Sequence, residues 1–190
     1  IASREDAESY LQERLGALRQ RPADQRDSKN AYFVSRGILA AMTCLDDNSP
    51  QVQGLTYERI CLLRASCGTQ RVLDGIPTHL KLGDYANAEE LALALSDGSR
   101  HARSKGHVRE ADAYAADSLD VLRALWWSRM DAHSTIVLSE GLCRAAREST
   151  GDTINTKSLL DEAIESARAL RKRSEDEDNI QAYIFILEQV

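Results

Sequence analysis

Aromatic residues, prolines and long apolar runs are scarce in this 190-residue chain. Aromatic residues make up 5% of it, and only two Phe and three Pro occur. The longest apolar run, 182–187, is far shorter than the ~20 residues that a membrane span needs. β-branched residues are sparse, whereas Ala, Leu, Glu, Arg and Ser dominate. This composition predicts an all-α protein and argues against a sheet.

Cysteine is limited to four residues that form no Cys-x-x-Cys pair: Cys44, Cys61, Cys67 and Cys143. Each lies in a helical, mostly apolar context, so we expect four reduced, buried thiols in a cytoplasmic or nuclear protein. No secretory signal is visible, and the first residue, Ile1, is not an initiator methionine. The chain is therefore expected to be processed or excised from a longer one.

The size and charge are typical of one folded domain. The chain has 24 Lys and Arg against 30 Asp and Glu, a net charge of −6, and 43% hydrophobic residues. An acidic chain without aromatic residues between its cations does not fit a nucleic-acid surface. We expect a single domain over 1–190, with a sub-boundary near 68–83, that binds neither nucleic acid nor a membrane.

Apolar residues recur at helical spacing almost from end to end. Ser49 and Pro50 fit the N-cap and first position of one helix, and other helices are expected to begin near Asp131 and at Thr156. The pattern leaves open whether the helix that begins after Gly83 continues past Gly98, because an interior glycine costs about 1 kcal/mol.

A first helix from Ser3 and a short helix within 71–82 bring the expected number to about nine. Residues 171–178 have two interpretations. Either three cations end one helix and Ser174 with Glu177 opens the next as a capping box, or one helix continues with ion pairs at i,i+4. The break is favoured. Helices joined by short loops form either a closed bundle or a stack of helical hairpins.

One segment resembles the tetratricopeptide repeat. In residues 80–92, Gly83-Asp84-Tyr85 ends one helix of the pattern, and Ala88 lies at the close crossing with the next. The repeats are degenerate, because Gly83 and Gly106 are 23 residues apart and the family period is ~34. The resemblance implies a TPR-like α-solenoid of stacked antiparallel hairpins, whose surface binds a peptide or a partner subunit.

Sequence motifs for catalysis or cofactor binding are absent. The chain contains no Gly-x-Gly-x-x-Gly, no Walker loop, no Gly-x-Ser-x-Gly and no His-Glu-x-x-His. Asp46-Asp47 fits a capped turn better than a magnesium site, and His107 with Glu110 fits a charge pair in the first helical turn better than a metal site. We expect no cofactor, no metal and no catalytic residue.

The segment 100–109 concentrates four cations and two histidines in a net acidic chain. The cations are Arg100, Arg103, Lys105 and Arg109. Cations at a helix C-terminus complement the helix dipole, which is the ordinary explanation. The alternative is a binding site for a carboxylate, an acidic peptide or a phosphate at the turn between two helices.

Trp126 and Trp127 are neighbours in a predicted helix, so their side chains point about 100° apart. Trp126 extends the core stripe, and Trp127 faces elsewhere, either at a helix seam or as an exposed binding anchor. The last apolar run, with Ile184 and Phe185, is expected to pack against a further repeat or a partner chain.

These features favour a protein–protein interaction scaffold or adaptor that binds a peptide or a partner subunit. An acidic peptide is one candidate for the partner, and the chain is a candidate subunit of a larger complex. The expected contact residues are Arg100, Arg103, Lys105, Arg109 and Trp127. Two alternatives stay open: a regulatory helical domain that senses a small anion, and a helical-bundle enzyme whose site residues are scattered along the chain.

Overall fold

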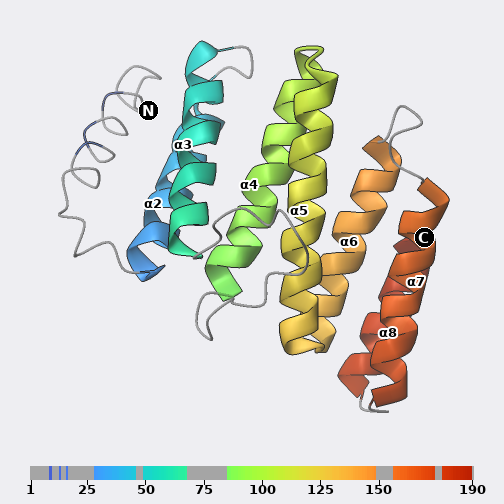
Figure 1. The fold of residues 1–190 in the computed structure, drawn as a ribbon. Coiled ribbons are helices and arrows are strands. Elements are labelled where there is room, and N and C mark those ends of the chain that lie inside the picture. The colour runs from blue at the N-terminus through green and yellow to red at the C-terminus, as the bar shows by residue number, and fades with distance from the viewer. Residues whose placement is uncertain are drawn as a thin grey trace.

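The structure is a computed structural model that describes residues 28–45, 49–67, 85–148, 156–173 and 177–189, together with residues 9, 13 and 16. Every regular element in this part of the chain is a helix, and the seven helices pack against one another (Figure 1). They are α2 (Ser28–Thr43), α3 (Pro50–Ser66), α4 (Tyr85–Ser104), α5 (Val108–Arg129), α6 (Ala132–Glu148), α7 (Thr156–Arg173) and α8 (Glu177–Gln189). The expected all-α class is confirmed.

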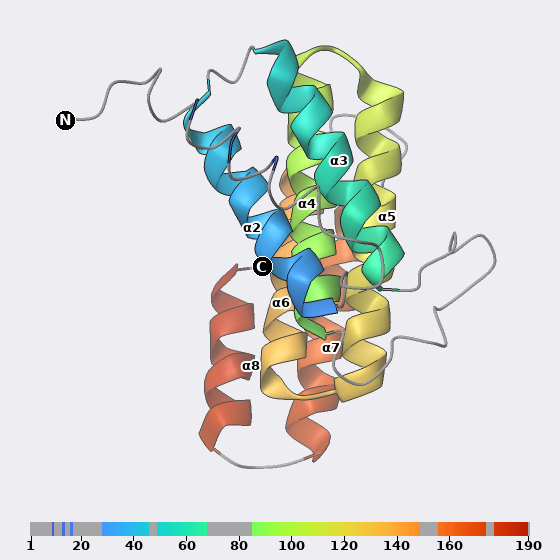
Figure 2. The ribbon, with the colours of Figure 1, turned by 90° about the vertical axis from the view of Figure 1, so that its left-hand side faces the viewer.

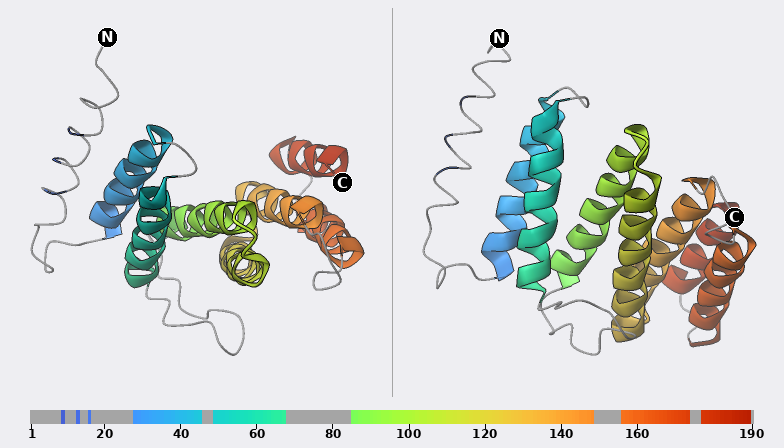
Figure 3. Two further views of the ribbon diagram at one scale, coloured as in Figure 1. Left: turned by 90° about the horizontal axis from the view of Figure 1, so that it is seen from above. Right: turned by 45° about the horizontal axis from the view of Figure 1, so that its top comes forward.

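The helices stand side by side in chain order, with α2 and α8 at opposite ends of the row (Figure 1). Each packs against the next, and α2 also contacts α4, as α6 contacts α8. Seen from above, α2, α4, α6 and α8 lie on one side of the row and α3, α5 and α7 on the other (Figure 3, left). The view along the row gives the same two layers (Figure 2).

Two apolar clusters fill the space between the helices. The larger extends from α3 through α7 and includes Leu91, Leu125 and Leu142, all at most 1% exposed. The smaller lies between α2 and α3 around Ile38 and Leu55. Helix α2 therefore belongs to a separate apolar cluster, and its junction with α4 depends on other contacts.

A buried polar layer makes that junction. The Arg59 side chain on α3 is 1% exposed, and its Nη2 donates a hydrogen bond to Glu90 Oε1 on α4 at 2.5 Å. Its Nε donates to Ser35 Oγ on α2 at 3.1 Å, and its Nη1 donates to Asp97 Oδ2 on α4 at 3.0 Å. Ser35 Oγ in turn donates to Glu90 Oε1 at 3.2 Å. One guanidinium thus joins three helices.

The predicted starts of three helices are confirmed. The Ser49 hydroxyl accepts a hydrogen bond from the backbone N–H of Gln51 at 3.3 Å, so it caps α3. Asp131 caps α6: the Ser134 N–H donates to Asp131 Oδ1 at 2.8 Å, and the Asp131 N–H donates to Ser134 Oγ at 3.2 Å. Helix α7 begins at Thr156.

Helix α4 continues through Gly98 to Ser104, which answers the question that the sequence left open. A Cβ at position 98 would lie 3.3 Å from Ile60 Cδ1 and 3.3 Å from Tyr114 Cδ2. Glycine therefore lets α3 and α5 approach α4 closely, and this packing offsets its low helix propensity.

Helix α7 ends at Arg173 and α8 begins at Glu177, and the two pack against each other. This excludes one continuous helix and confirms the break, while Ser174 lies outside the described residues. The expected helix from Ser3, the short helix within 71–82 and the sub-boundary near 68–83 also lie outside them.

The prediction of four buried thiols is wrong for two of the cysteines. All four are free, but Cys44 and Cys61 are exposed, whereas Cys67 and Cys143 are buried. Cys44 follows the last residue of α2, and Cys61 neighbours the buried Ile60 but is itself exposed, on the side of α3 that carries Tyr57. An apolar local context does not by itself give the face of a helix.

Replacing Glu90 with alanine is expected to lower the free energy of unfolding by about 3 kcal/mol, because it leaves the buried Arg59 guanidinium with fewer partners. The double variant Arg59→Met, Glu90→Leu removes both charges and is expected to be more stable than Glu90→Ala alone. Urea denaturation followed by circular dichroism measures both values. A Glu90→Ala variant as stable as the native chain would contradict this role.

The cap at Asp131 predicts a pH-dependent contribution to stability. Burial acts to raise the pKa of Asp131, but hydrogen bonds from Ser134 and the Arg129 guanidinium outweigh it and lower the pKa below its usual 3.8. A carboxylate with a lowered pKa stabilises the fold above its unfolded-state pKa, and the contribution is lost as the pH falls through the folded-state pKa.

We therefore expect Asp131→Ala to lower the free energy of unfolding by about 1 kcal/mol at pH 7 and by less at pH 3. Asp131→Asn keeps a capping oxygen and is the control, which should lose less at pH 7. Urea denaturation at the two pH values provides the test, and an equal loss for Asp131→Ala at both would rule out a contribution from the ionised carboxylate.

Candidate binding groove between α3 and the α4–α5 hairpin

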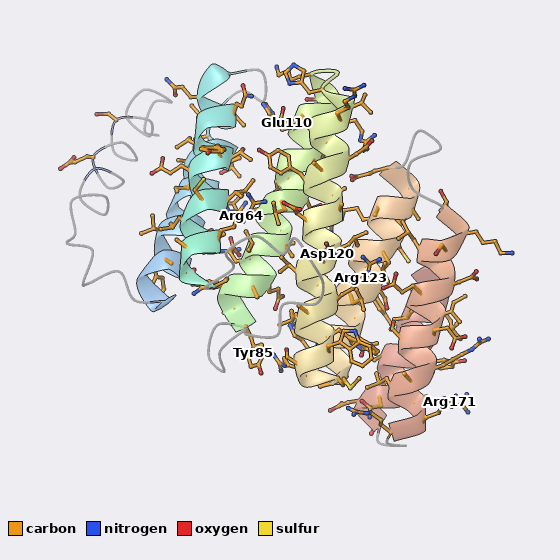
Figure 4. The ribbon with its side chains drawn as sticks, viewed as in Figure 1. Arg64, Tyr85, Glu110, Asp120, Arg123 and Arg171 are labelled. Atoms are coloured by element: carbon orange, nitrogen blue, oxygen red, sulfur yellow. The ribbon has the colours of Figure 1, made fainter. Side chains whose placement is uncertain are left out.

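A groove of about 410 Å³ lies between α3, the last turns of α4 and the first turns of α5. We call it the α3–α5 groove. Its charged and aromatic walls are formed by Tyr57, His101, Lys105, His107, Glu110 and Tyr114. Glu110, labelled in Figure 4, marks its position at the upper end of the molecule in that view.

Small residues leave room for the groove. Gly54 on α3 has no atom of another residue within 4 Å of the position that a Cβ would occupy. Gly98 and Ala102 lie opposite it along α4. A larger side chain at position 54 would extend into the groove, whereas one at position 98 would collide with Tyr114 and Ile60.

Basic groups outnumber acidic ones along the walls. His101, Lys105 and His107 face a single carboxylate, Glu110, whose Oε2 lies 3.5 Å from His107 Nδ1. This pair is the first-turn charge pair that the sequence predicts.

Two tyrosines provide the aromatic part of the walls. Burial, followed by the Glu110 carboxylate, raises the pKa of Tyr114 above its usual 10.0. A hydrogen bond with Cys61 raises the pKa of Tyr57, which is 63% exposed. Both phenols therefore stay protonated at neutral pH, and each can donate a hydrogen bond as well as offer a ring face.

The cations expected to bind a partner do not form one cluster. Arg100 pairs with Asp97 of its own helix at 2.7 Å, and Arg103 pairs with Asp112 on α5 at 2.8 Å. The Arg103 side chain is only 19% exposed. Lys105 lines the α3–α5 groove, whereas Arg109 is exposed outside its walls.

Trp127 lies near the opposite end of α5 from Arg109, so it cannot contact the same short peptide. Its side chain is 52% exposed. Trp126 packs against the core and donates a hydrogen bond through Nε1 to Thr135 Oγ1 at 3.0 Å. The predicted division between a core Trp126 and an outward-facing Trp127 is confirmed.

Sequence reasoning missed the two tyrosines as parts of a site. Tyr57 and Tyr114 are far apart in the chain and line the same groove because α3 packs against α4, which α5 contacts in turn. The small residues Gly54 and Gly98 are the only local signal, and they do not say which helices face each other across them.

No group of three or more His, Cys, Asp or Glu side chains in the described part of the chain could hold a metal ion. None of the described helices combines the length and apolar character that crossing a bilayer requires. Comparison with family models, with characterised proteins and with solved structures finds no match.

The two arginine pairs predict unequal losses of stability. Arg103→Ala is expected to lower the free energy of unfolding by about 1–2 kcal/mol, because it removes a largely buried ion pair that joins two helices. Arg100→Ala should cost less than about 0.5 kcal/mol, since its pair is exposed and lies within one helix. Thermal unfolding of both variants makes the comparison, and equal losses would contradict a structural role specific to Arg103.

Proposed function

We propose that the protein is an interaction scaffold or adaptor that binds an acidic peptide in the α3–α5 groove. The main observation behind this proposal is that three basic side chains and two tyrosines line one groove of about 410 Å³. Ligand sites commonly have such a size and combine apolar surface with a few polar groups.

The arrangement of the helices supports a repeat architecture. Helices α4, α6 and α8 begin 47 and 45 residues apart, and α5 and α7 begin 48 residues apart. Side-chain contacts join alternate helices: His133 on α6 lies 3.0 Å from Glu89 on α4, and Arg123 on α5 makes two 2.7 Å hydrogen bonds to Glu162 on α7. Stacked hairpins produce this pattern, which supports a TPR-like α-solenoid.

The spacing of the helices differs from the period of the tetratricopeptide repeat. The tetratricopeptide repeat has a period of ~34 residues, and the helices here recur at a longer spacing. Ala88, the small residue of the motif, is fully buried in the first turn of α4. The proposed likeness therefore rests on the stacking of helical hairpins and not on the length of the repeat.

The chemistry of the walls favours an acidic peptide with an apolar side chain. Lys105 provides positive charge for a carboxylate, and the two histidines provide further hydrogen-bond donors. The rings of Tyr57 and Tyr114 provide surface for an aliphatic or aromatic side chain. A small anion would use the basic groups and the phenol hydroxyls but would leave the tyrosine ring faces without a role, so a peptide uses more of the groove.

Selection from a random peptide library displayed on phage tests this proposal. We expect the native chain to enrich peptides that carry Asp or Glu beside an apolar residue. Lys105→Glu should reduce binding of those peptides at least tenfold, because it replaces attraction by repulsion, and fluorescence anisotropy measures the affinity.

Lys172→Glu is the matched control, because Lys172 is also an exposed lysine at a helix C-terminus but lies on α7. It should bind the selected peptides as the native chain does. The proposal fails if no peptide is enriched or if the two variants lose binding equally. Binding of inorganic phosphate at the groove without any peptide would favour the anion sensor instead.

A further inference from the structure

Helix α8 carries two apolar faces, of which the fold uses one. Ala182 and Ile186 are 2% and 0% exposed and lie on the face that packs against α6 and α7. A helix at the surface of a protein usually has one apolar stripe and a polar opposite face. The second face of α8 therefore needs its own explanation.

That face presents Ile180, Ile184 and Leu187, which are 42%, 48% and 45% exposed. Their spacing of i, i+4 and i+7 aligns them along one side of the helix. Phe185 of the same helix is 36% exposed but lies off this line. The exposed large apolar side chains of the other described helices stand singly or, for Val108 and Trp127 on α5, at opposite ends of their helix. A continuous exposed apolar stripe of this kind marks an interaction site.

The two borders of the stripe differ in charge. Glu177 and Glu188 both lie along one edge of the stripe, and both are exposed. On the other side the Arg171 guanidinium of α7 lies over the Tyr183 ring, 5.2 Å from its centroid, which is a cation–π contact. Helix α8 itself contains no Lys or Arg.

We propose that the Ile180–Ile184–Leu187 stripe docks an amphipathic helix of a partner protein whose flank is basic. The partner presents apolar residues at i, i+4 and i+7 and two Lys or Arg residues eleven positions apart. That spacing matches Glu177 and Glu188, which are about 16 Å apart along α8 at 1.5 Å per residue. This surface is separate from the α3–α5 groove, which favours an acidic ligand, whereas the stripe favours a basic one.

Charge disfavours a second copy of this chain as the occupant. Packing two α8 helices antiparallel about a two-fold axis brings Glu177 of one copy toward Glu188 of the other. Packing them parallel brings each acid toward its own counterpart. Like charges at such positions are destabilising, whereas a basic flank pairs with both acids.

Two synthetic helical peptides with the same apolar stripe test the proposal, one with two Lys eleven positions apart on one flank and the other with Glu at those positions. Fluorescence anisotropy with the full chain should give an affinity at least tenfold higher for the Lys peptide. The double variant Glu177→Lys, Glu188→Lys should reverse the preference between the two peptides. Ile184→Glu should lower the affinity for the Lys peptide at least tenfold.

Val108→Glu is the matched control, because Val108 is 47% exposed but lies on α5. It should leave binding unchanged, as should Lys105→Glu in the α3–α5 groove, which separates this proposal from the one above. Equal affinity for the two peptides, or no binding of either, would overturn the proposal. So would a dimer in sedimentation equilibrium that Ile184→Glu dissociates.

Discussion

The buried ion pair between Arg59 and Glu90 is the contact on which the arrangement of the first three described helices depends. A guanidinium at 1% exposure loses its hydration, so it is tolerated only where fixed acceptors replace water. Ser35, Glu90 and Asp97 provide those acceptors from α2 and α4. Because each acceptor has a direction, the pair fixes the orientation of α3 in a way that apolar packing alone does not.

The shape of the α3–α5 groove depends on that orientation of α3. One wall is α3, and the other is the α4–α5 hairpin. Arg59 holds α3 to α4, and an ion pair between Arg64 and Asp117, whose arginine is labelled in Figure 4, holds α3 to α5. Arg103 with Asp112 holds the hairpin together. The site therefore depends on charged contacts that lie outside its own walls.

Local features of the fold could be predicted, and long-range ones could not. Ser49 and Asp131 cap helices because their side chains reach backbone N–H groups within a few residues, which the sequence contains in full. The exposure of Cys61 and the position of Tyr57 and Tyr114 in one groove depend on which face α3 turns toward α4 and α5. A periodic pattern gives the faces of each helix but not their partners, so the basic segment was predicted and the groove beside it was not.

Histidine resonances provide the most direct test of the groove as the binding site. His101 and His107 lie in its walls, whereas His133 pairs with Glu89 away from it. A ¹³C-labelled chain is titrated with an acidic peptide selected on the native protein, and the imidazole signals are followed by NMR. The account predicts that His101 and His107 shift together while His133 does not. Shifts of His133 alone, or equal shifts of all three, would contradict it.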